Sequence, residues 1–327
     1  MSGSKPSITA IILSYNEEVH IARCIERLWP VVSRIVVVDS FSTDATVAIA
    51  RGLGAEVLQN PWKNYAAQFQ WGVDNAAITT DWTMRIDCDE YLEDGLQAAI
   101  LRQVPQLPGD ITACDFKLKV IFQGQFIRWG GYYRTILTRL WRTGVGQIEQ
   151  RWMDEHIVIA HGQRQRLSGG DLVDHNLKDI TWWTDKHNGY ATRQMIDFIS
   201  LEQPLFAVDQ RVRSDNNQTA KWKRFLRNIV YAGAPLYLRA VLYFVQRYFL
   251  RLGFLDGKKG FVWHFLQGFW FFVLMDAKVD EARTFIATHG LEAFKQHLAD
   301  RFGVTDLAPV APSDALPTAA PAAPLRQ

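Results

Sequence analysis

The stretch Trp82-Thr-Met-Arg-Ile-Asp-Cys-Asp-Glu90 decides the fold, because an apolar run ends there in three carboxylates within four residues. A buried strand over residues 82–86 would deliver Asp87, Asp89 and Glu90 together at its carboxyl end, where open α/β sheets bind ligands. Alternation along an extended chain puts Asp87 and Asp89 on the same side. Two carboxylates at this spacing are suitable ligands for a Mg²⁺ or Mn²⁺ ion that also binds a diphosphate. The alternative interpretation is an exposed acidic turn without a ligand.

The segments on the amino-terminal side of this stretch alternate between apolar strands and amphipathic helices. We expect strands at residues 7–13, 34–38 and 55–58, and helices at residues 21–28, 45–51 and 62–77. Strands that alternate with helices predict a mostly parallel sheet with helices on both faces, and therefore an α/β fold class for residues 7 to about 100.

Polar clusters follow the first two expected strands. Ser14-Tyr-Asn-Glu-Glu18 follows the first strand, and Asp39-Ser-Phe-Ser-Thr-Asp44 follows the second. Parallel strands bring such ends to one edge, where Asp39 is suited to ribose hydroxyls or a base edge. No Gly-x-Gly-x-x-Gly follows the first strand and no Walker lysine is present, which argues against a nicotinamide or P-loop site. A nucleotide held by side chains and a metal fits better.

These motifs, taken in order, resemble those of inverting glycosyltransferases of family 2. The resemblance rests on Ser14-Tyr-Asn-Glu-Glu18, Asp39-Ser-Phe-Ser-Thr-Asp44, Gln68 and Asp87-Cys-Asp-Glu90, and it covers roughly residues 7–160. Each motif is weak alone, but their joint order is specific.

Two further segments are similar to the bacterial branch of that family that builds lipopolysaccharide core and exopolysaccharide. They are Gly130-Gly-Tyr-Tyr133 and Arg139-Leu-Trp-Arg142. The resemblance implies a GT-A type, Rossmann-like fold, a nucleotide-diphosphate sugar donor, with UDP the expected nucleotide, and a divalent cation, Mg²⁺ or Mn²⁺.

The same resemblance implies the donor-site residues. Asp89 and Asp87 would hold the metal, and the nucleotide sugar would contact Ser14, Tyr15, Asn16, Glu17, Asp39, Ser40, Gln68, Asp87 and Cys88. Cys88 is a departure, because Ala is more usual in the family at this position. It should be tolerated, since the middle residue of the motif points away from the metal.

The segment Trp152-Met-Asp-Glu-His156 contains the candidates for the catalytic base. Direct transfer with inversion needs a carboxylate or His to accept the proton of the acceptor hydroxyl, and the family places an acid in a comparable position. We expect Glu155 to be the base, with Asp154 as the second choice and His156 as an acceptor-side neighbour. A surface salt-bridge cluster is the alternative, but the flanking residues are apolar.

Three more residues are candidates for the acceptor side. Arg139 belongs to the family-like segment, and Trp182 and Trp183 could stack on sugar rings through their apolar faces. Packing in the core or at a membrane interface is an equally open interpretation of the two tryptophans.

The chain changes character in its last third. Residues 211–259 carry a net charge of +9, whereas the whole chain carries only +2. On a helix over residues 236–252, three arginines would share one side and face anionic headgroups, above an apolar face. The membrane-contact candidates are Arg239, Arg247, Arg251, Leu242 and Phe249.

This region is more typical of a helix lying in the plane of an anionic bilayer surface than of a membrane span, which needs about 20 residues with few charges. Ordinary core packing is the alternative. A nucleic-acid partner is disfavoured, because no recognition motif accompanies the basic residues.

Composition sets the boundaries of the expected domains. A chain of 327 residues with 48% hydrophobic content can bury a full core. We expect an N-terminal extension (1–6), a GT-A catalytic domain (7–210, with a nucleotide-binding half to about residue 100 and an acceptor half at 101–210), a basic, aromatic-rich amphipathic helical region (211–305) and a disordered Ala/Pro tail (306–327).

The compartment follows from cysteine usage and from the N-terminal sequence. Three cysteines fit neither a disulfide framework nor a zinc site, and the N-terminus lacks a signal-peptide pattern. We therefore expect a cytoplasmic protein, peripheral at the inner face of the cytoplasmic membrane.

The sequence thus predicts an inverting glycosyltransferase that moves a sugar from a nucleotide-diphosphate donor to a lipid-linked saccharide acceptor, in lipopolysaccharide core or exopolysaccharide biosynthesis. A sugar nucleotidyltransferase is the enzymatic alternative, although the glycine-rich basic loop that it needs after the first strand is missing. A non-catalytic peripheral membrane module is the second alternative.

Overall fold

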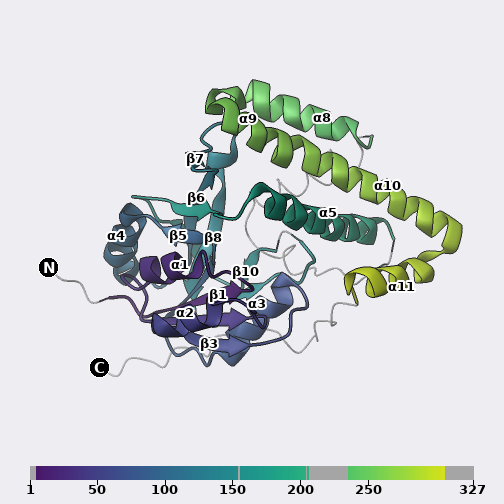
Figure 1. Cartoon of the computed structure of the whole chain (residues 1–327). Coiled ribbons are helices and arrows are strands. Elements are labelled where there is room, and N and C mark those ends of the chain that lie inside the picture. The colour runs from purple at the N-terminus through teal and green to yellow at the C-terminus, as the bar shows by residue number, and fades with distance from the viewer. Residues whose placement is uncertain (1–4, 154, 204, 206–234, 306–327) are drawn as a thin grey trace.

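The computed structural model describes residues 5–153, 155–203, 205 and 235–305. Asp154, most of the basic residues that raise the local charge, and the Ala/Pro tail therefore lie outside the described residues. The described chain has a sheet with covering helices at one end and a group of long helices at the other (Figure 1).

The nucleotide-binding half is a run of four parallel strands in the spatial order β3-β2-β1-β4. The strands are β1 (Ile8–Ser14), β2 (Arg34–Asp39), β3 (Glu56–Gln59) and β4 (Trp82–Asp87). The helices that connect them are α1 (Ile21–Leu28), α2 (Thr46–Gly52) and α3 (Tyr65–Asn75). The predicted alternation of strands and helices is confirmed.

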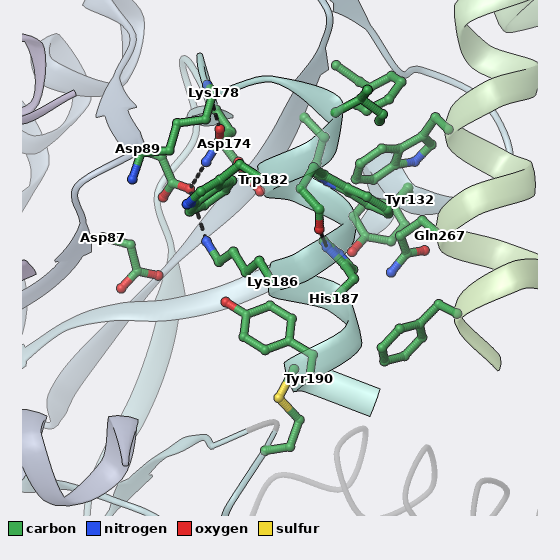
Figure 2. Close-up of a pocket in the computed structure, with 18 of the residues that line it drawn as sticks. Asp87, Asp89, Tyr132, Asp174, Lys178, Trp182, Lys186, His187, Tyr190 and Gln267 are labelled. Atoms are coloured by element: carbon green, nitrogen blue, oxygen red, sulfur yellow. Dashed lines mark hydrogen bonds and ion pairs between the residues drawn. The ribbon is translucent and has the colours of Figure 1, made fainter. Parts of the chain in front are cut away.

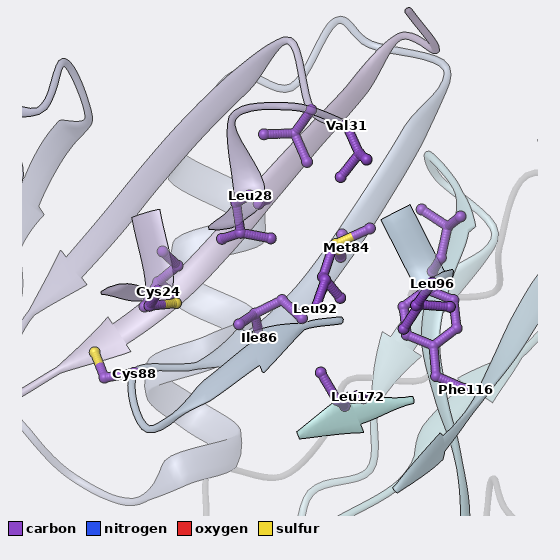
Figure 3. Packing of buried hydrophobic residues seen from close by; sticks show 14 of the residues in the cluster. Cys24, Leu28, Val31, Met84, Ile86, Cys88, Leu92, Leu96, Phe116 and Leu172 are labelled. Atoms are coloured by element: carbon purple, nitrogen blue, oxygen red, sulfur yellow. The ribbon is translucent and has the colours of Figure 1, made fainter. Parts of the chain in front are cut away.

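Strands β1, β2 and β4 are buried on both faces, which explains why they are apolar without alternation. Ile8, Ala10 and Ile12 pack with α1 in one hydrophobic cluster, whereas Ile11 and Leu13 pack with α3 in another. Figure 3 shows the first cluster, in which side chains of α1, β4 and β12 meet.

The second half of the sheet is mixed in direction and continues the order as β8-β6-β12-β5. Strand β8 is antiparallel to both of its neighbours, and β12 is antiparallel to β5. The strands are β5 (Glu90–Leu92), β6 (Ile111–Phe122), β7 (Gln125–Phe126), β8 (Ile136–Arg142), β11 (Gln163–Arg166) and β12 (Leu172–His175), with helix α4 (Asp94–Gln103) between β5 and β6. A separate hairpin pairs β9 (Gly146–Ile148) with β10 (Ile157–Ile159).

The remaining helices form the other end of the molecule. Helix α10 packs along α5, and α11 closes the far end of that pair (Figure 1). The helices are α5 (Ile180–Glu202), α8 (Leu238–Val245), α9 (Gly257–Phe265), α10 (Phe271–His289) and α11 (Leu291–Phe302). Together with the sheet, they confirm the expected fold class, an α/β fold followed by a helical region.

The Gly130-Gly131 pair is where the helical end docks onto the sheet. Both glycines have positive φ, at +71° and +83°, which L side chains rarely adopt. A Cβ on Gly130 would lie 2.3 Å from the His264 ring, and one on Gly131 would lie 2.5 Å from the Arg251 guanidinium. Only glycine lets the two ends approach so closely.

Buried charge reinforces this junction. The carboxylate of Asp256 accepts hydrogen bonds from the backbone N–H groups of Arg128 and Trp129 at 3.0 Å. It also pairs with Nε2 of His264 at 3.1 Å, while Nδ1 of that ring accepts from Arg247 Nε at 2.9 Å. The tautomer that donates to Asp256 and accepts from Arg247 satisfies both contacts.

Two of the expected membrane-facing arginines were therefore placed wrongly. Arg239 and Arg247 are only 4% and 1% exposed. Arg239 forms an ion pair with the fully buried Asp276 on α10, and Arg247 bonds to His264 and Gln267. Helical periodicity alone predicted that these arginines lie on an exposed polar face. They are buried instead, because their ion-pair and hydrogen-bond partners, which are distant in sequence, lie in the interior.

The other three candidates of this region lie at the surface. Arg251 is exposed, Leu242 is 56% exposed and Phe249 is 53% exposed. Among the residues that the structure describes, no helix is both long and apolar enough to cross a bilayer.

Candidate active site

The carboxyl ends of β1, β2 and β4 meet at one edge of the sheet, as expected of parallel strands. Ser14 at the end of β1 donates a hydrogen bond to the Asp39 carboxylate at 2.9 Å. Asp39 also accepts from the Ser42 N–H at 2.8 Å and from Gln59 Nε2 at 3.3 Å. Because Asp39 is fully buried, its carboxylate fixes the loop after β2 rather than lying open to solvent.

The loops after β1 and β2 are tied to each other. Asn16, with φ at +53°, accepts from the Thr43 N–H at 2.8 Å through its side-chain oxygen. The Glu17 carboxylate bonds to His20 at 2.6 Å and to Lys178 Nζ at 3.0 Å. Lys178 also donates to the Asn16 carbonyl at 2.7 Å. Lys178, which lies just before α5, therefore stabilises the conformation of the loop after β1 through these two contacts.

Three more expected donor-site residues differ in accessibility. Tyr15 is 57% exposed at the tip of the first loop. Ser40 and Gln68 are buried, and Gln68 Nε2 donates to Ser40 Oγ at 3.0 Å while its carbonyl accepts from Asn60 at 2.7 Å. Gln68 thus supports the loop after β2 from beneath.

Asp87 ends β4 among cationic and phenolic groups. Its carboxylate pairs with Arg139 at 3.2 Å and accepts a hydrogen bond from the Tyr65 hydroxyl. Burial alone would raise the pKa of Asp87, but Arg139 and Arg85 lower it to about 2. Asp87 is therefore ionised at neutral pH.

Asp89 is held by a different set of partners. Asn176 Nδ2 donates to its carboxylate at 3.1 Å, and Lys186 Nζ lies 3.7 Å away. Burial opposes ionisation, yet the nearby Lys186 lowers the pKa of Asp89. Its backbone carbonyl accepts from the His175 N–H at 3.0 Å, which joins this turn to the end of β12.

Cys88, between the two aspartates, is buried in the hydrophobic cluster and lies 3.0 Å from the Leu13 carbonyl. The Cys88 side chain thus faces the hydrophobic core, whereas its direction relative to a metal and its contact with the nucleotide sugar stay predictions. Glu90 is also buried, where it pairs with Arg139, and burial raises the pKa of Glu90 to about 8.

Arg139 was expected on the acceptor side, and this expectation is wrong. The arginine is 5% exposed and forms ion pairs with Glu90 and Asp87 behind the strand end. The three acids of the opening stretch need a buried counter-charge, and β8, which is paired with β4, supplies it.

A cavity of about 1130 Å³ opens in front of these carboxylates. Asp87, Asp89 and Asp174 line it from the sheet, while Lys178, Trp182 and Lys186 line it from the start of α5 (Figure 2). Its further walls come from α8, α9 and α10. The cavity therefore lies between the sheet edge and the helical end.

Asp174, Lys178 and Lys186 were not predicted as site residues. Asp174 reaches the site because β12 pairs with β5, opposite Glu90. Burial and the neighbouring Asp89 raise the pKa of Asp174 to about 7. Tyr190 and Asp89 raise the pKa of Lys186 against the effect of burial, so its amine stays charged. A polar Asp-His-Asn run after an apolar pair was the only sequence signal.

The two expected tryptophans both line the cavity. Trp183 is buried and stacks on the His187 ring with centroids 3.4 Å apart. Trp182 lies between the amines of Lys178 and Lys186, at 4.3 and 4.7 Å from its ring centre. Of the two tryptophans, Trp182 is therefore the one beside the charged groups.

The candidate bases lie on the loop between β9 and β10. Asp154 lies outside the described residues. Glu155 is half-buried and its carbonyl accepts from Arg85 at 3.4 Å, but it is not among the residues lining the cavity, although Arg151 and Met153 are. His156 is exposed and lies 3.4 Å from Glu149.

The fit of a divalent cation rests on oxygen ligands. Among the described residues, no group of three or more His, Cys, Asp or Glu side chains is arranged to hold a metal. Asp89 and Asp87 nevertheless line one cavity, and Mg²⁺ or Mn²⁺ needs few protein carboxylates when a diphosphate supplies further oxygens. Burial, and then the neighbouring Asp89, raises the pKa of Asp174, and a cation at this position would favour the ionised carboxylates. The residues present therefore fit such an ion.

Comparison with known proteins gives a family match for part of the chain. Residues 9–169 match the model of glycosyl transferase family 2. An uncharacterized glycosyltransferase of Rickettsia felis is 43% identical over 93 residues, which are 28% of this chain and 32% of that protein. The lipopolysaccharide core biosynthesis glycosyltransferase LpsC of Rhizobium meliloti is 35% identical over 98 residues, 28% of this chain and 35% of that protein. The chain thus spans about a third of the length of these relatives.

Solved structures show weaker similarity. Glucosyl-3-phosphoglycerate synthase from Mycobacterium tuberculosis, in complex with Mn²⁺, UDP-glucose and phosphoglyceric acid, is 25% identical with a TM-score of 0.29, over 36% of this chain and 45% of that one. TarS 1–349 of S. aureus in complex with UDP is 17% identical with a TM-score of 0.35, over 42% and 47% of the two chains. At these scores, neither structure bears on the ligand of this chain.

Proposed function

We propose, on the premise that residues 9–169 match the model of glycosyl transferase family 2, that the chain transfers a sugar from a nucleotide-diphosphate donor to a saccharide acceptor with inversion. UDP is the expected nucleotide. The observation that carries the proposal is the cavity in front of β4. It places two ionised aspartates and two lysines at the carboxyl end of the parallel strands.

In this proposal, the nucleotide lies over the loops after β1 and β2. Tyr15 is exposed there, and Asn16 and Glu17 are held in shape by Lys178. Asp39 and Gln68 act from beneath, because both are buried and bonded to serines of the second loop. These five of the nine predicted donor-site residues would thus divide into residues that contact the nucleotide and residues that support its loops.

The diphosphate would face Asp89 and Lys186. Asp89 and Asp87 would hold the divalent cation, whose chemistry is Lewis-acid stabilisation of the departing diphosphate. Lys186 adds a fixed positive charge 3.7 Å from the Asp89 carboxylate. A preorganised charge in a site with little water stabilises charge that develops in the transition state.

The acceptor hydroxyl attacks the anomeric carbon, a new C–O bond forms, and the bond to the β-phosphate oxygen breaks. Glu155 is the proposed base for the hydroxyl proton, with Asp154 as the second choice, as the family resemblance implies. Asp174 is a rival that the sequence did not indicate, because it is a carboxylate that lines the cavity itself.

We place the helical end at an anionic membrane surface, and the cytoplasmic face remains the expected side. Large apolar side chains between residues 237 and 265 are exposed, and Arg251, Lys258 and Lys259 are exposed beside them. Apolar area together with basic residues is what binds a helix to anionic lipid. The exposed apolar residues are Tyr237, Leu238, Val241, Leu242, Val245, Phe249, Leu250, Leu252, Phe254, Leu255, Phe261 and Phe265.

The acceptor is proposed to be a lipid-linked saccharide of lipopolysaccharide core or exopolysaccharide biosynthesis. The name of the Rhizobium meliloti relative supports the first of these. Trp182 is the ring proposed to stack on the acceptor sugars, because Trp183 is buried and already stacked on His187.

Analysis of the nucleotide product tests the proposal. Purified protein is incubated with Mn²⁺, a panel of nucleotide sugars and a membrane extract that supplies acceptors. Sugar transfer releases free nucleoside diphosphate. In parallel samples with added pyrophosphate, a sugar nucleotidyltransferase working in reverse would yield nucleoside triphosphate and sugar 1-phosphate. A non-catalytic membrane module does neither. If none of the nucleotide sugars in the panel yields free nucleoside diphosphate, the proposed function is wrong.

A further inference from the structure

The cavity continues well beyond the charged groups, along the groove between α5 and α10. Its lining on α5 extends from Asp179 to Leu201, a span of about 33 Å at 1.5 Å per helical residue. Its volume of about 1130 Å³ exceeds the range of about 300–1,000 Å³ that is usual for a single small ligand. A donor held at Asp89 would leave the rest of the groove open to a second molecule.

The character of the lining changes along this groove. The charged groups Asp89, Asp174 and Lys186 lie at the sheet end. The wall formed by α8 and α10 is mainly apolar, and the last turns of α5 contribute Phe198 and Leu201 beside Gln194 and Asp197. The apolar residues of this part are Phe198, Leu201, Tyr243, Phe271, Phe272 and Met275.

Aromatic contacts connect the groove to the exposed face of α8. Tyr243 on α8 meets Phe272 on α10 edge to face, with ring centroids 4.8 Å apart. Val241 and Leu242, the two residues before Tyr243, are 44% and 56% exposed. One short helix thus contributes both to the groove and to the proposed membrane face.

From this arrangement, we propose that the groove between α5 and α10 binds the apolar chain of an amphiphilic acceptor, whose sugar end lies at Trp182 and Lys186. This inference rests on the proposed function and deepens it, because it assigns the hydrocarbon part of the acceptor to named residues. A purely polar acceptor would gain nothing from an apolar wall, because burying polar groups there without partners costs free energy. A chain of methylenes gains about 0.8 kcal/mol for each CH₂ buried.

Alkyl maltosides of increasing chain length, kept below their micelle concentrations, are suitable probes. Calorimetry on the full chain with methyl, hexyl and octyl β-maltoside should show affinity rising about 3- to 4-fold for each added methylene, which is the fold-change for 0.8 kcal/mol. An octyl maltoside with a photoreactive diazirine at the chain end should label peptides of α10 around Phe272 and of α5 around Leu201.

Two exposed leucines form a matched pair for this test. Leu201 lines the groove and is 54% exposed, whereas Leu242 is 56% exposed and does not line it. Leu201→Gln should lower octyl maltoside affinity about 10-fold, since burial of a leucine side chain contributes about 1.5–3 kcal/mol. Leu242→Gln should leave that affinity unchanged. Neither side chain is in the core, so both variants are expected to fold.

Two outcomes would overturn the inference. One is an affinity that is independent of chain length, and the other is photolabelling confined to peptides that contain Leu242 or Phe249. Titration of UDP with Mn²⁺ into the same samples separates this failure from failure of the proposed function. If UDP still binds but the affinity for alkyl maltosides does not depend on their chain length, the groove proposal is wrong and the proposed function is not affected.

Discussion

Charged side chains line a cavity at the sheet edge, whereas in the C-terminal helices two arginines form buried contacts. At the sheet edge, Asp87, Asp89 and Lys186 line an open cavity. In the helices, Arg239 and Arg247 are buried against partners, while leucines and phenylalanines cover the surface. Charge that lines a cavity can meet a ligand, whereas charge in a buried pair holds helices together, so a charged residue in the sequence does not by itself indicate a contact surface.

This difference yields predictions for each region. The largest expected effect belongs to Lys186. Lys186→Met should lower kcat by about 10²- to 10³-fold, the loss seen when one preorganised group that stabilises transition-state charge is removed. Lys186→Arg keeps the charge but changes its geometry, so partial activity is expected. Steady-state kinetics measure the effect, with a Lys295→Met variant as a control because Lys295 does not line the cavity. Wild-type kcat in Lys186→Met would remove this lysine from the reaction.

The candidate bases come next. Glu155→Gln should lower turnover by about 10²-fold while donor affinity stays nearly unchanged, because the group acts on the acceptor proton. Asp174→Asn is the parallel variant, since Asp174 lines the cavity and Glu155 does not. Measuring kcat and donor affinity for both variants distinguishes them. Loss of turnover in Asp174→Asn alone would transfer the proposed role to Asp174.

In the helical region, the buried ion pair of Arg239 and Asp276 is expected to stabilise the folded protein. Arg239→Gln leaves the Asp276 carboxylate buried without its cation, which typically costs about 3–5 kcal/mol. The exposed Arg251 is the matched control, and Arg251→Gln should change the free energy of unfolding by less than about 0.5 kcal/mol. Urea unfolding compares the two variants. Equal stability of both would mean that Arg239 does not hold α8 to α10.

Substitutions on the exposed apolar face should weaken membrane binding without changing the stability of the fold. Changing Leu242 and Phe249 together to Gln removes two large side chains that are more than half exposed. Insertion of each such side chain is worth about 1.5–3 kcal/mol, so affinity for anionic vesicles should fall at least about 10-fold. Co-sedimentation with these vesicles, run beside a thermal melt, measures both properties. Wild-type protein that stays in the supernatant at low salt would contradict the membrane proposal.

The sequence predicted the sheet edge well for a physical reason. Buried parallel strands are continuous apolar runs, and polar residues directly after them must lie at one edge. Asp39, Asp87 and Asp89 could therefore be placed from local pattern alone. Asp174 and Lys186 could not, because they reach the site through pairing of β12 with β5 and packing of α5, neither of which has a local signal.

The helices were harder to predict, because their arginines have partners that are distant in sequence. Helical periodicity placed Arg239 and Arg247 on one polar side, but could not show that Asp276 and His264 would face that side. Leu242 and Phe249 are exposed, as a membrane-contact role requires, and that role stays a prediction.

The central claim is that the sheet edge binds a nucleotide diphosphate through Asp89, and calorimetric titration of UDP with Mn²⁺ tests it most directly. The wild type should show saturable one-to-one binding, and Asp89→Asn should lose most of it, because a charged oxygen ligand is removed while the shape is kept. Asp94, whose side chain is 88% exposed, supplies the control variant Asp94→Asn, which should bind like the wild type. Equal affinity of all three proteins, or no binding by the wild type, would contradict the claim.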